Sequence, residues 1–285
     1  MKPLQQKIEE TIANTKWKLS KRLRGLLRRN QRYLEAGLWE ASGLMSARTG
    51  RSDWPKVSLV IDWKDMMYEG YPAHYFSSGY SALFCVRRAL DEAGKKSPGS
   101  ILDFGCGHGR VLRSLMADFP QARLTAADLN AGGPNFCAKT FGAIPVYSST
   151  DLSRVSFDTK FDLIWVGSVF THLRAERWLS LWELFRSVLT EDGLLVFSTH
   201  GGEVARRLRE GRCGLYGLEP ERASEILQGY DKSGFGYSDY RKSKDYGVSV
   251  STPEWVNRQI VEVGLKPVLC QKNGWDDCQD VWAAT

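Results

Sequence analysis

The chain has few cysteines and histidines, the residues that bind zinc or, for cysteine, cross-link loops. It contains six cysteines and four histidines in 285 residues. The cysteines form no Cys-x-x-Cys pair, and the histidines are scattered along the chain. Disulfide frameworks and zinc sites are both recognised by regular spacings of such residues. The sequence therefore predicts reduced thiols and no metal site.

Long apolar runs are also missing. No stretch approaches the ~20 apolar residues that cross a bilayer, and the start of the chain lacks the apolar segment of a signal peptide. With 42% apolar residues, the chain has enough material to bury one large α/β core. The sequence therefore predicts a cytoplasmic protein.

Excess positive charge is confined to one end of the chain. Residues 1–60 carry 13 Lys and Arg against 5 Asp and Glu, whereas residues 61–285 carry 26 against 28. A nucleic-acid substrate calls for a basic surface near the active site. The distribution argues against such a substrate unless the N-terminal segment delivers it. We divide the chain into a basic helical extension with a linker, residues 1–60, and a main domain, residues 61–285.

The N-terminal extension has the pattern of a basic amphipathic helix. Over residues 4–40, apolar side chains recur at three- and four-residue steps with Lys and Arg between them. Such a helix can lie on the inner face of a membrane, associate with a second copy, or pack on the rest of the chain. These three alternatives stay open. Residues 41–60 are rich in Ser, Gly and Arg and are expected to form a linker.

Three glycines in five residues mark the centre of the main domain. They follow a short apolar run with the composition of a strand, residues 101–104, and precede a helical pattern. Gly105, Gly107 and Gly109 let the backbone turn sharply and approach a ligand closely. The N-terminus of the following helix directs free N–H groups and the positive end of its dipole at that ligand. Asp103 stands two residues before the first glycine.

The resulting pattern, Asp-x-Gly-x-Gly-x-Gly, differs from the dinucleotide fingerprint G-x-G-x-x-G, because Arg110 stands at the third glycine position of that fingerprint. It resembles the first motif of the class I S-adenosylmethionine-dependent methyltransferases. The resemblance implies an α/β, Rossmann-like fold with a seven-stranded, mostly parallel sheet, helices on both faces and an antiparallel last strand. It also implies that S-adenosylmethionine is the cofactor, with its methionine part held by Asp103 and by the glycine loop that contains Cys106.

A second acid follows the second expected strand, residues 123–130. Asp128 lies 23 residues beyond Gly105, and an acid at that strand end can accept hydrogen bonds from both hydroxyls of a ribose. Leu129 follows Asp128 and is expected beside the same cofactor. Found alone, Asp128 would be interpreted as a helix N-cap.

The third and fourth strands supply the remaining cofactor candidates. In the family a polar residue after the third strand reaches the adenine amine, and the resemblance assigns Asp151, followed by Leu152, to that place; a turn-stabilising role for Asp151 stays open. Residues 161–173 resemble the fourth strand and its exit. That match implies that Gly167 and Ser168 lie beside the cofactor.

Two histidines are candidates for a general base. His172 and His200 follow the fourth and fifth expected strands, and His108 lies in the glycine loop. Open α/β sheets bind ligands at the carboxyl ends of their parallel strands. A base within hydrogen-bond reach of a hydroxyl acceptor would add rate. His200 and His172 are the first candidates, with Asp280 and Tyr240 behind them.

Residues 201–252 form a long insertion that is rich in Tyr and Gly. Long segments of this kind are often lids or binding elements, and tyrosines supply flat stacking surfaces and hydroxyl donors for a sugar. A fainter likeness connects this insertion to bacterial methyltransferases of surface-glycan pathways. The predicted function is methyl transfer from S-adenosylmethionine to a saccharide or another small polar acceptor. Two alternatives stay open: an RNA or protein methyltransferase that docks through the basic arm, and a non-catalytic cofactor-binding scaffold.

Overall fold

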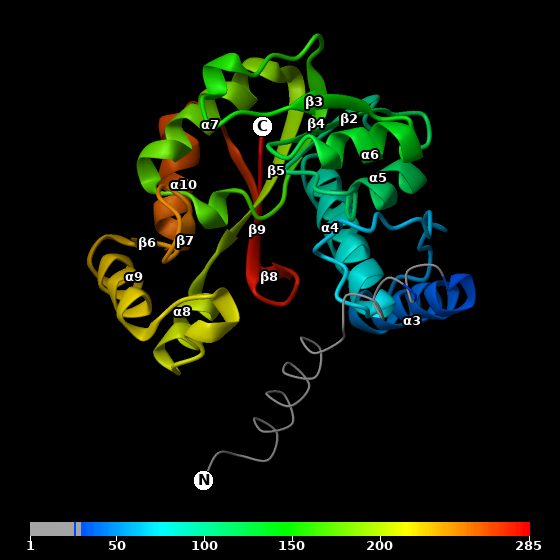
Figure 1. The fold of residues 1–285 in the computed structure, drawn as a ribbon. Coiled ribbons are helices and arrows are strands. Elements are labelled where there is room, and N and C mark those ends of the chain that lie inside the picture. The colour runs from blue at the N-terminus through cyan, green and yellow to red at the C-terminus, as the bar shows by residue number, and fades with distance from the viewer. Residues whose placement is uncertain (1–25, 27–29) are drawn as a thin grey trace.

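A seven-stranded sheet forms the centre of the molecule (Figure 1). The computed structural model describes residue 26 and residues 30–285, and the sheet has the order β3-β2-β1-β4-β5-β9-β8. Its strands are β1 (Ser100–Phe104), β2 (Arg123–Asp128), β3 (Ile144–Tyr147), β4 (Phe161–Val166), β5 (Leu189–His200), β8 (Pro267–Trp275) and β9 (Gln279–Ala284). Strands β1 to β5 pair in parallel, and β9 is antiparallel to both β5 and β8. The fold class expected from the sequence is confirmed.

Helices cover both faces of this sheet, and each face has its own apolar core. The core on one face takes buried side chains from α3 (Gln31–Thr49), α4 (Pro72–Glu92), α5 (Leu112–Asp118) and α6 (Gly132–Phe141). The core on the other face takes them from α7 (Ala175–Val188) and α10 (Pro253–Glu262). Because both faces are covered, the central strands are apolar along most of their length, as in β4.

The insertion at residues 201–252 folds as a small lobe beyond the end of β5 (Figure 1). It contains α8 (Gly202–Arg209), the short helix η3 (Cys213–Tyr216), α9 (Pro220–Ser233) and the hairpin of β6 (Phe235–Asp239) and β7 (Gly247–Ser251). Val204, Ile226 and Val248 are fully buried in a third apolar cluster that belongs to this lobe. The insertion therefore has a core of its own, and its movement as a lid stays a prediction.

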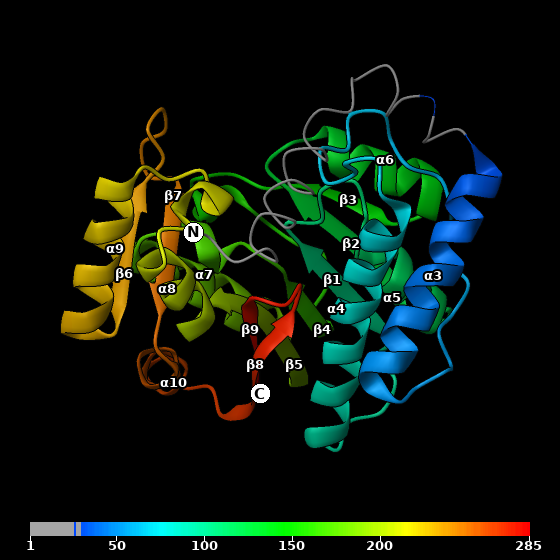
Figure 2. The same cartoon turned by 90° about the horizontal axis from the view of Figure 1, so that it is seen from below.

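The prediction of a linker over residues 41–60 is wrong for residues 41–49, because α3 continues to Thr49. Leu34, Ala41 and Met45 form a buried stripe that packs in the same core as α4, and this packing extends the helix through the expected linker. Figure 2 shows α3 lying along the outer side of α4. The earlier part of the expected basic helix lies outside the described residues. Among the helices that the structure describes, none combines the length and apolar character needed to cross a membrane.

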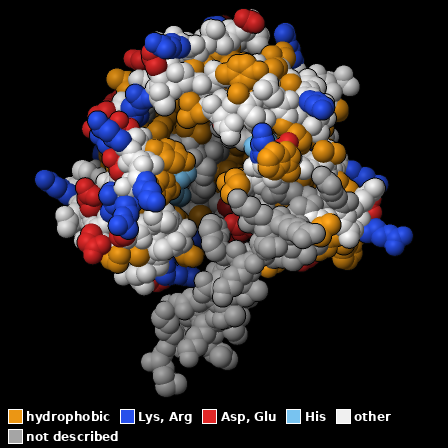
Figure 3. Space-filling view, in the orientation of Figure 1, with side chains coloured by type: hydrophobic (Ala, Val, Ile, Leu, Met, Phe, Trp, Pro, Cys, Tyr) orange, Lys and Arg blue, Asp and Glu red, His pale blue; other side chains and the backbone are white. Residues whose placement is uncertain are grey.

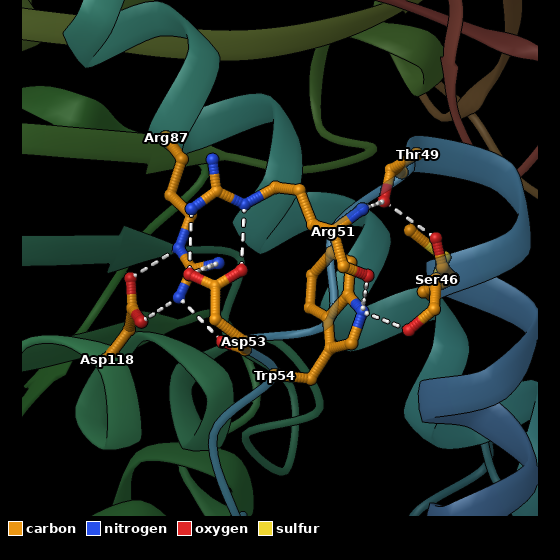
Figure 4. Close-up of polar contacts among 8 residues, drawn as sticks. Ser46, Thr49, Arg51, Asp53, Trp54, Arg87 and Asp118 are labelled. Carbon is orange, nitrogen blue, oxygen red and sulfur yellow. Dashed lines mark hydrogen bonds and ion pairs between the residues drawn. The ribbon is translucent and has the colours of Figure 1, made fainter.

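Ion pairs of Arg87 join the segment after α3 to α4, and α4 to α5 (Figure 4). The Arg87 guanidinium donates from Nε to Asp118 Oδ2 at 2.9 Å, and its Nη1 lies 3.3 Å from Asp53 Oδ2. The Trp54 indole N–H donates to Ser46 Oγ at 3.2 Å. Although this segment has no regular secondary structure, these contacts hold it against α3 and α4, and Arg87 in turn joins α4 to α5.

The glycine loop offers a direct test of the packing around β1. Gly109 has a φ of 74°, and a Cβ built on it would lie 2.5 Å from Phe141 Cε2. We expect Gly109→Ala to lose about 1–2 kcal/mol of unfolding free energy to left-handed strain and a further roughly 1–3 kcal/mol to overpacking. Gly142→Ala is the control, because Gly142 has a φ of 69° but no atom within 4 Å of its Cβ position. Equal losses in urea unfolding of the two variants would contradict the overpacking.

Candidate functional site

The glycine loop turns where the sequence predicts it. Gly105, Gly107 and Gly109 all have positive φ, at 81°, 49° and 74°, which L side chains rarely adopt. The N–H groups of Gly105 and Cys106 donate to Ala127 O at 2.8 and 3.0 Å, so the end of β2 anchors the start of the loop. A Cβ on Gly107 would meet no protein atom within 4 Å, and this part of the loop therefore faces open space.

Asp128 ends β2 beside this loop and is half-buried. Its Oδ2 accepts the Gly107 N–H at 2.9 Å, and its Oδ1 accepts the Asn130 N–H at 2.8 Å. Each carboxylate oxygen has further acceptor capacity, which would suit the two hydroxyls of a ribose. Leu129 is 61% exposed next to it and could offer an apolar surface to an adenine ring.

Asp103 lies at the end of β1 and is 2% exposed. Its Oδ2 is buried and has no hydrogen-bond partner among the described residues. Burial, and secondly the negative charge of Asp128, raise the pKa of Asp103 to about 7. The Leu112 N–H bonds to the carboxyl, but the unpartnered Oδ2 is costly to bury, and a ligand ammonium group would satisfy it. This acid, the glycine loop and Asp128 together fit S-adenosylmethionine, whose methionine part carries such an ammonium.

The raised pKa of Asp103 predicts proton release on ligand binding. Free Asp103 with a pKa of about 7 is mostly protonated at pH 6, whereas an ammonium beside it favours the ionised form. We expect S-adenosylhomocysteine to displace close to one proton at pH 6 and few at pH 8. Calorimetry in two buffers of different ionisation enthalpy measures this number. Asp103→Asn is the control and should show no such release, while a wild-type protein without release at pH 6 would contradict the prediction.

The exit of β4 lies against the glycine loop. A Cβ on Gly105 would lie 2.7 Å from Val169 Cγ2 and 3.7 Å from Gly167 O, so the two turns are in contact. Gly167 is itself packed closely, because its Cβ would lie 2.8 Å from the Trp275 ring. Ser168 has a φ of 60°, although it is not a glycine. The structure therefore brings Gly167 and Ser168 to the loop expected to bind the cofactor.

Asp151 lies at the exit of β3, where its carboxyl caps the short helix η1 (Leu152–Arg154). Its Oδ1 accepts the Ser153 N–H at 3.2 Å and the Ser153 hydroxyl at 2.6 Å. Leu152 is half-buried and packs against the core beneath α7. The turn-stabilising role is therefore present in the structure, and contact of Asp151 or Leu152 with an adenine stays a prediction.

The two candidate bases come together at the ends of β4 and β5. His172 lies in the short helix η2 (Phe170–His172), His200 ends β5, and their ring centroids are 6.4 Å apart. Strand β7 supplies a partner to each ring: His172 Nδ1 lies 2.8 Å from Gly247 O, and His200 Nδ1 lies 3.1 Å from Ser249 O. Residues 247 and 249 alternate along β7, so both carbonyls point to the same edge of the hairpin.

These carbonyls determine the tautomer of both rings. A carbonyl only accepts, so Nδ1 carries the hydrogen in each neutral ring and Nε2 keeps its lone pair. Burial lowers the pKa of His172. Burial, and secondly the nearby His172, lower the pKa of His200 to about 3. Both shifts favour the neutral rings, and the described residues supply no hydrogen-bond partner to either Nε2.

Tyrosines from the insertion surround the histidine pair. The ring centroids of Tyr246 and Tyr216 lie 4.9 Å from His172 and 5.5 Å from His200, respectively, and the Tyr240 hydroxyl lies 3.3 Å from His172 Nδ1. Burial, and secondly the negative charge of Asp128, raise the pKa of Tyr246. Figure 3 shows the surface hollowed between this lobe and the α4 side, with histidine side chains in the wall.

Other sequence candidates lie elsewhere. Asp280 is paired with Thr199 across β5 and β9, so it projects from the face opposite to His200, and its Oδ1 accepts the Asn273 N–H. His108 lies on the glycine loop, where its Nε2 is 3.9 Å from Asp62 Oδ1. Sequence reasoning missed Gln279, which the antiparallel pairing places opposite His200. No motif in the sequence marks it.

The strand order, the glycine loop after β1 and the acid after β2 define a nucleoside-binding α/β fold of the methyltransferase type. Residues 101–193 match the family model described as a methyltransferase domain. Residues 101–193 therefore form a methyltransferase domain, and the whole sheet has the class I S-adenosylmethionine-dependent fold. S-adenosylmethionine is the cofactor of that class.

Curated relatives share part of this domain. The chain is 31% identical over 112 residues to a malonyl-[acyl-carrier protein] O-methyltransferase of Acetivibrio thermocellus, a match that covers 37% of each protein. It is 25% identical over 194 residues to the enzyme of the same name from a Paenibacillus species, covering 63% of this chain and 60% of that protein. The matches thus span less than two thirds of the length of these relatives.

Solved structures share the fold at low sequence identity. A 1,6-didemethyltoxoflavin-N1-methyltransferase of Burkholderia thailandensis, solved with S-adenosylhomocysteine bound, superposes with a TM-score of 0.51 at 14% identity over 88% of each chain. An S-adenosylmethionine-dependent methyltransferase of Clostridium acetobutylicum superposes with a TM-score of 0.50 at 14% identity, over 87% of this chain and 98% of that one. These likenesses support the fold.

Proposed function

We propose that this chain transfers the methyl group of S-adenosylmethionine to a hydroxyl of a small polar acceptor such as a saccharide. The observation that carries the proposal is the pair His172 and His200 at the strand ends beside the cofactor candidates, where no residue in the described part of the chain bonds to either Nε2. The cofactor supplies a methyl group already activated by its sulfonium. The protein has to hold the acceptor oxygen in line with that methyl and to accept its proton.

His172 is the better proton acceptor of the pair. Two imidazoles 6.4 Å apart disfavour simultaneous protonation. Burial and the positive charge of Arg207 act against protonation of His200. A transferred proton therefore goes to His172 Nε2, and Gly247 O keeps that ring in place through Nδ1. His200 remains neutral, and its Nε2 can accept a hydrogen bond from a second hydroxyl of the acceptor.

The lining of the site favours an uncharged acceptor. Tyr216, Tyr240 and Tyr246 offer hydroxyls and ring faces around the imidazoles. Arg207, whose positive charge acts on His200, is already paired with a carboxylate: its Nε lies 2.7 Å from Glu203 Oε1. The named relatives are malonyl-[acyl-carrier protein] O-methyltransferases, whose substrate name indicates a carboxylate. A carboxylate acceptor would need a free cation, so we favour a hydroxyl.

Methyl-labelled S-adenosylmethionine tests the proposal. The protein is incubated separately with saccharides, metabolites, malonyl-acyl carrier protein, RNA and protein, and incorporation of label is measured for each. We expect label in the saccharide or small-metabolite fraction, in a form that resists mild alkali, because an ether survives alkali and a methyl ester does not. Alkali-labile label on the carrier protein would contradict a hydroxyl acceptor.

The remaining alternatives give different results in the same experiment. Label in RNA or protein that disappears at high salt would indicate docking through the basic arm, whose first residues lie outside the described chain. Binding of the cofactor without label in any fraction would indicate a scaffold. Either result would overturn the proposed acceptor class.

A further inference from the structure

A closed ring of hydrogen bonds joins the ends of β4, β5 and β9. The Ser168 N–H donates to Ser198 Oγ at 2.8 Å, the Ser198 hydroxyl donates to Gln279 Oε1 at 2.7 Å, and Gln279 Nε2 donates to Ser168 Oγ at 2.7 Å. Ser198 is fully buried, and Gln279 is 7% exposed. Three segments distant in sequence thus depend on one amide side chain.

The ring stabilises an unfavourable backbone conformation. Ser168 has a φ of 60°, and a non-glycine residue in this region costs about 1–2 kcal/mol. Two of the three ring bonds end on Ser168, one on its N–H and one on its Oγ, and these bonds offset that cost. Strained residues that persist in this way are concentrated at functional sites.

The ring also limits where the Ser168 hydroxyl proton can go. Ser168 Oγ accepts from Gln279 Nε2, and its own O–H donates to no atom of the described residues. Gln279 is a donor at this contact and cannot take that proton. The Ser168 O–H is therefore available to donate to a ligand. Ser168 lies at the β4 exit, which contacts the glycine loop, and it precedes His172 by four residues in the sequence.

We propose that Gln279 is a positioning residue for the methyl-transfer site, because it holds the β4 exit in its left-handed turn and keeps the Ser168 hydroxyl proton available to a bound ligand. The inference rests on the proposed function only in that the ligand is S-adenosylmethionine or its product. Gln279 reaches the site through the antiparallel β9, whose register places it opposite His200, and it acts through Ser168 rather than on the reacting atoms.

Calorimetric titration with S-adenosylhomocysteine tests this role in the intact chain. Gln279→Met keeps the length of the side chain and removes the two ring bonds that Gln279 makes, so we expect roughly tenfold weaker binding of S-adenosylhomocysteine. Thr199→Val is the matched control: its Oγ1 accepts the Trp282 indole N–H at 3.1 Å, one residue along β5 on the opposite face. Thr199→Val should leave the affinity unchanged even if thermal unfolding shows that it lowers stability.

Gln279→Glu separates positioning from packing. The ionised carboxylate only accepts, so Ser168 would turn its proton toward Glu and away from the ligand. The protonated acid can donate to Ser168 Oγ as the amide does, so the loss of affinity relative to wild type should shrink as the pH is lowered. Binding by Gln279→Met equal to wild type, or a Gln279→Glu loss independent of pH, would overturn the inference. If the wild type itself did not bind S-adenosylhomocysteine, the proposed methyltransferase function would be overturned together with this inference.

Discussion

Replacement of His172 by alanine is expected to lower kcat by about 10²- to 10⁴-fold, the range that a positioned general base contributes. The affinity for S-adenosylhomocysteine should stay within a factor of two, roughly, since no cofactor candidate bonds to this ring. His172 Nε2 is the free acceptor of the ring, and its Nδ1 is bonded to Gly247 O. Single-turnover rates on the acceptor found by the label experiment, together with calorimetry, measure the two effects.

The pH dependence gives this prediction a second readout. Burial lowers the pKa of His172 below 6.5, and a base must be neutral to work. The rate should therefore be flat above pH 6.5 and fall only as the pH drops below that value, and His172→Ala should lose this acidic limb. His200→Ala is the comparison: it should lower turnover and keep the limb. An unchanged kcat in His172→Ala would remove the ring from the mechanism.

The second large effect is expected for Asp128→Ala. This carboxylate accepts the Gly107 N–H, and we propose that it accepts both ribose hydroxyls. Loss of two hydrogen bonds to a charged group should weaken the binding of S-adenosylmethionine by roughly 100-fold or more. The glycine loop also loses a partner, which adds to the loss. Calorimetry with S-adenosylhomocysteine measures the change without any acceptor.

Asp162, near the start of β4, is a matched control for Asp128, which lies at the end of β2. Asp162 Oδ2 also accepts two backbone N–H groups, from Gly99 at 2.9 Å and Ser100 at 3.0 Å, next to the start of β1. Asp162→Ala should lower stability through the same kind of lost bonds and leave ligand affinity intact. If both variants bound S-adenosylhomocysteine as the wild type does, Asp128 would not be the ribose acid.

Much of the fold follows from local patterns. The strands from Ile101 to Phe197 stand out as short apolar runs, because both faces of the sheet are covered and their residues are apolar on both sides. The predicted linker begins too early, since Ala41 and Met45 continue a buried stripe that packs with α4, a helix that begins only at Pro72. A composition rich in Ser and Gly does not show that a helix will be held by such packing.

The sequence by itself determined the parts of the site that are built from neighbouring residues: the glycine turn, the acids Asp103 and Asp128, and the histidines after two strands. The tertiary structure alone decided how these groups behave. Whether His172 offers Nε2 or Nδ1 depends on a carbonyl of β7, and whether Ser168 keeps its turn depends on Gln279 in the last strand. Hydrogen bonds between residues 75 and 111 positions apart leave no local pattern, since only folding brings their donors and acceptors together.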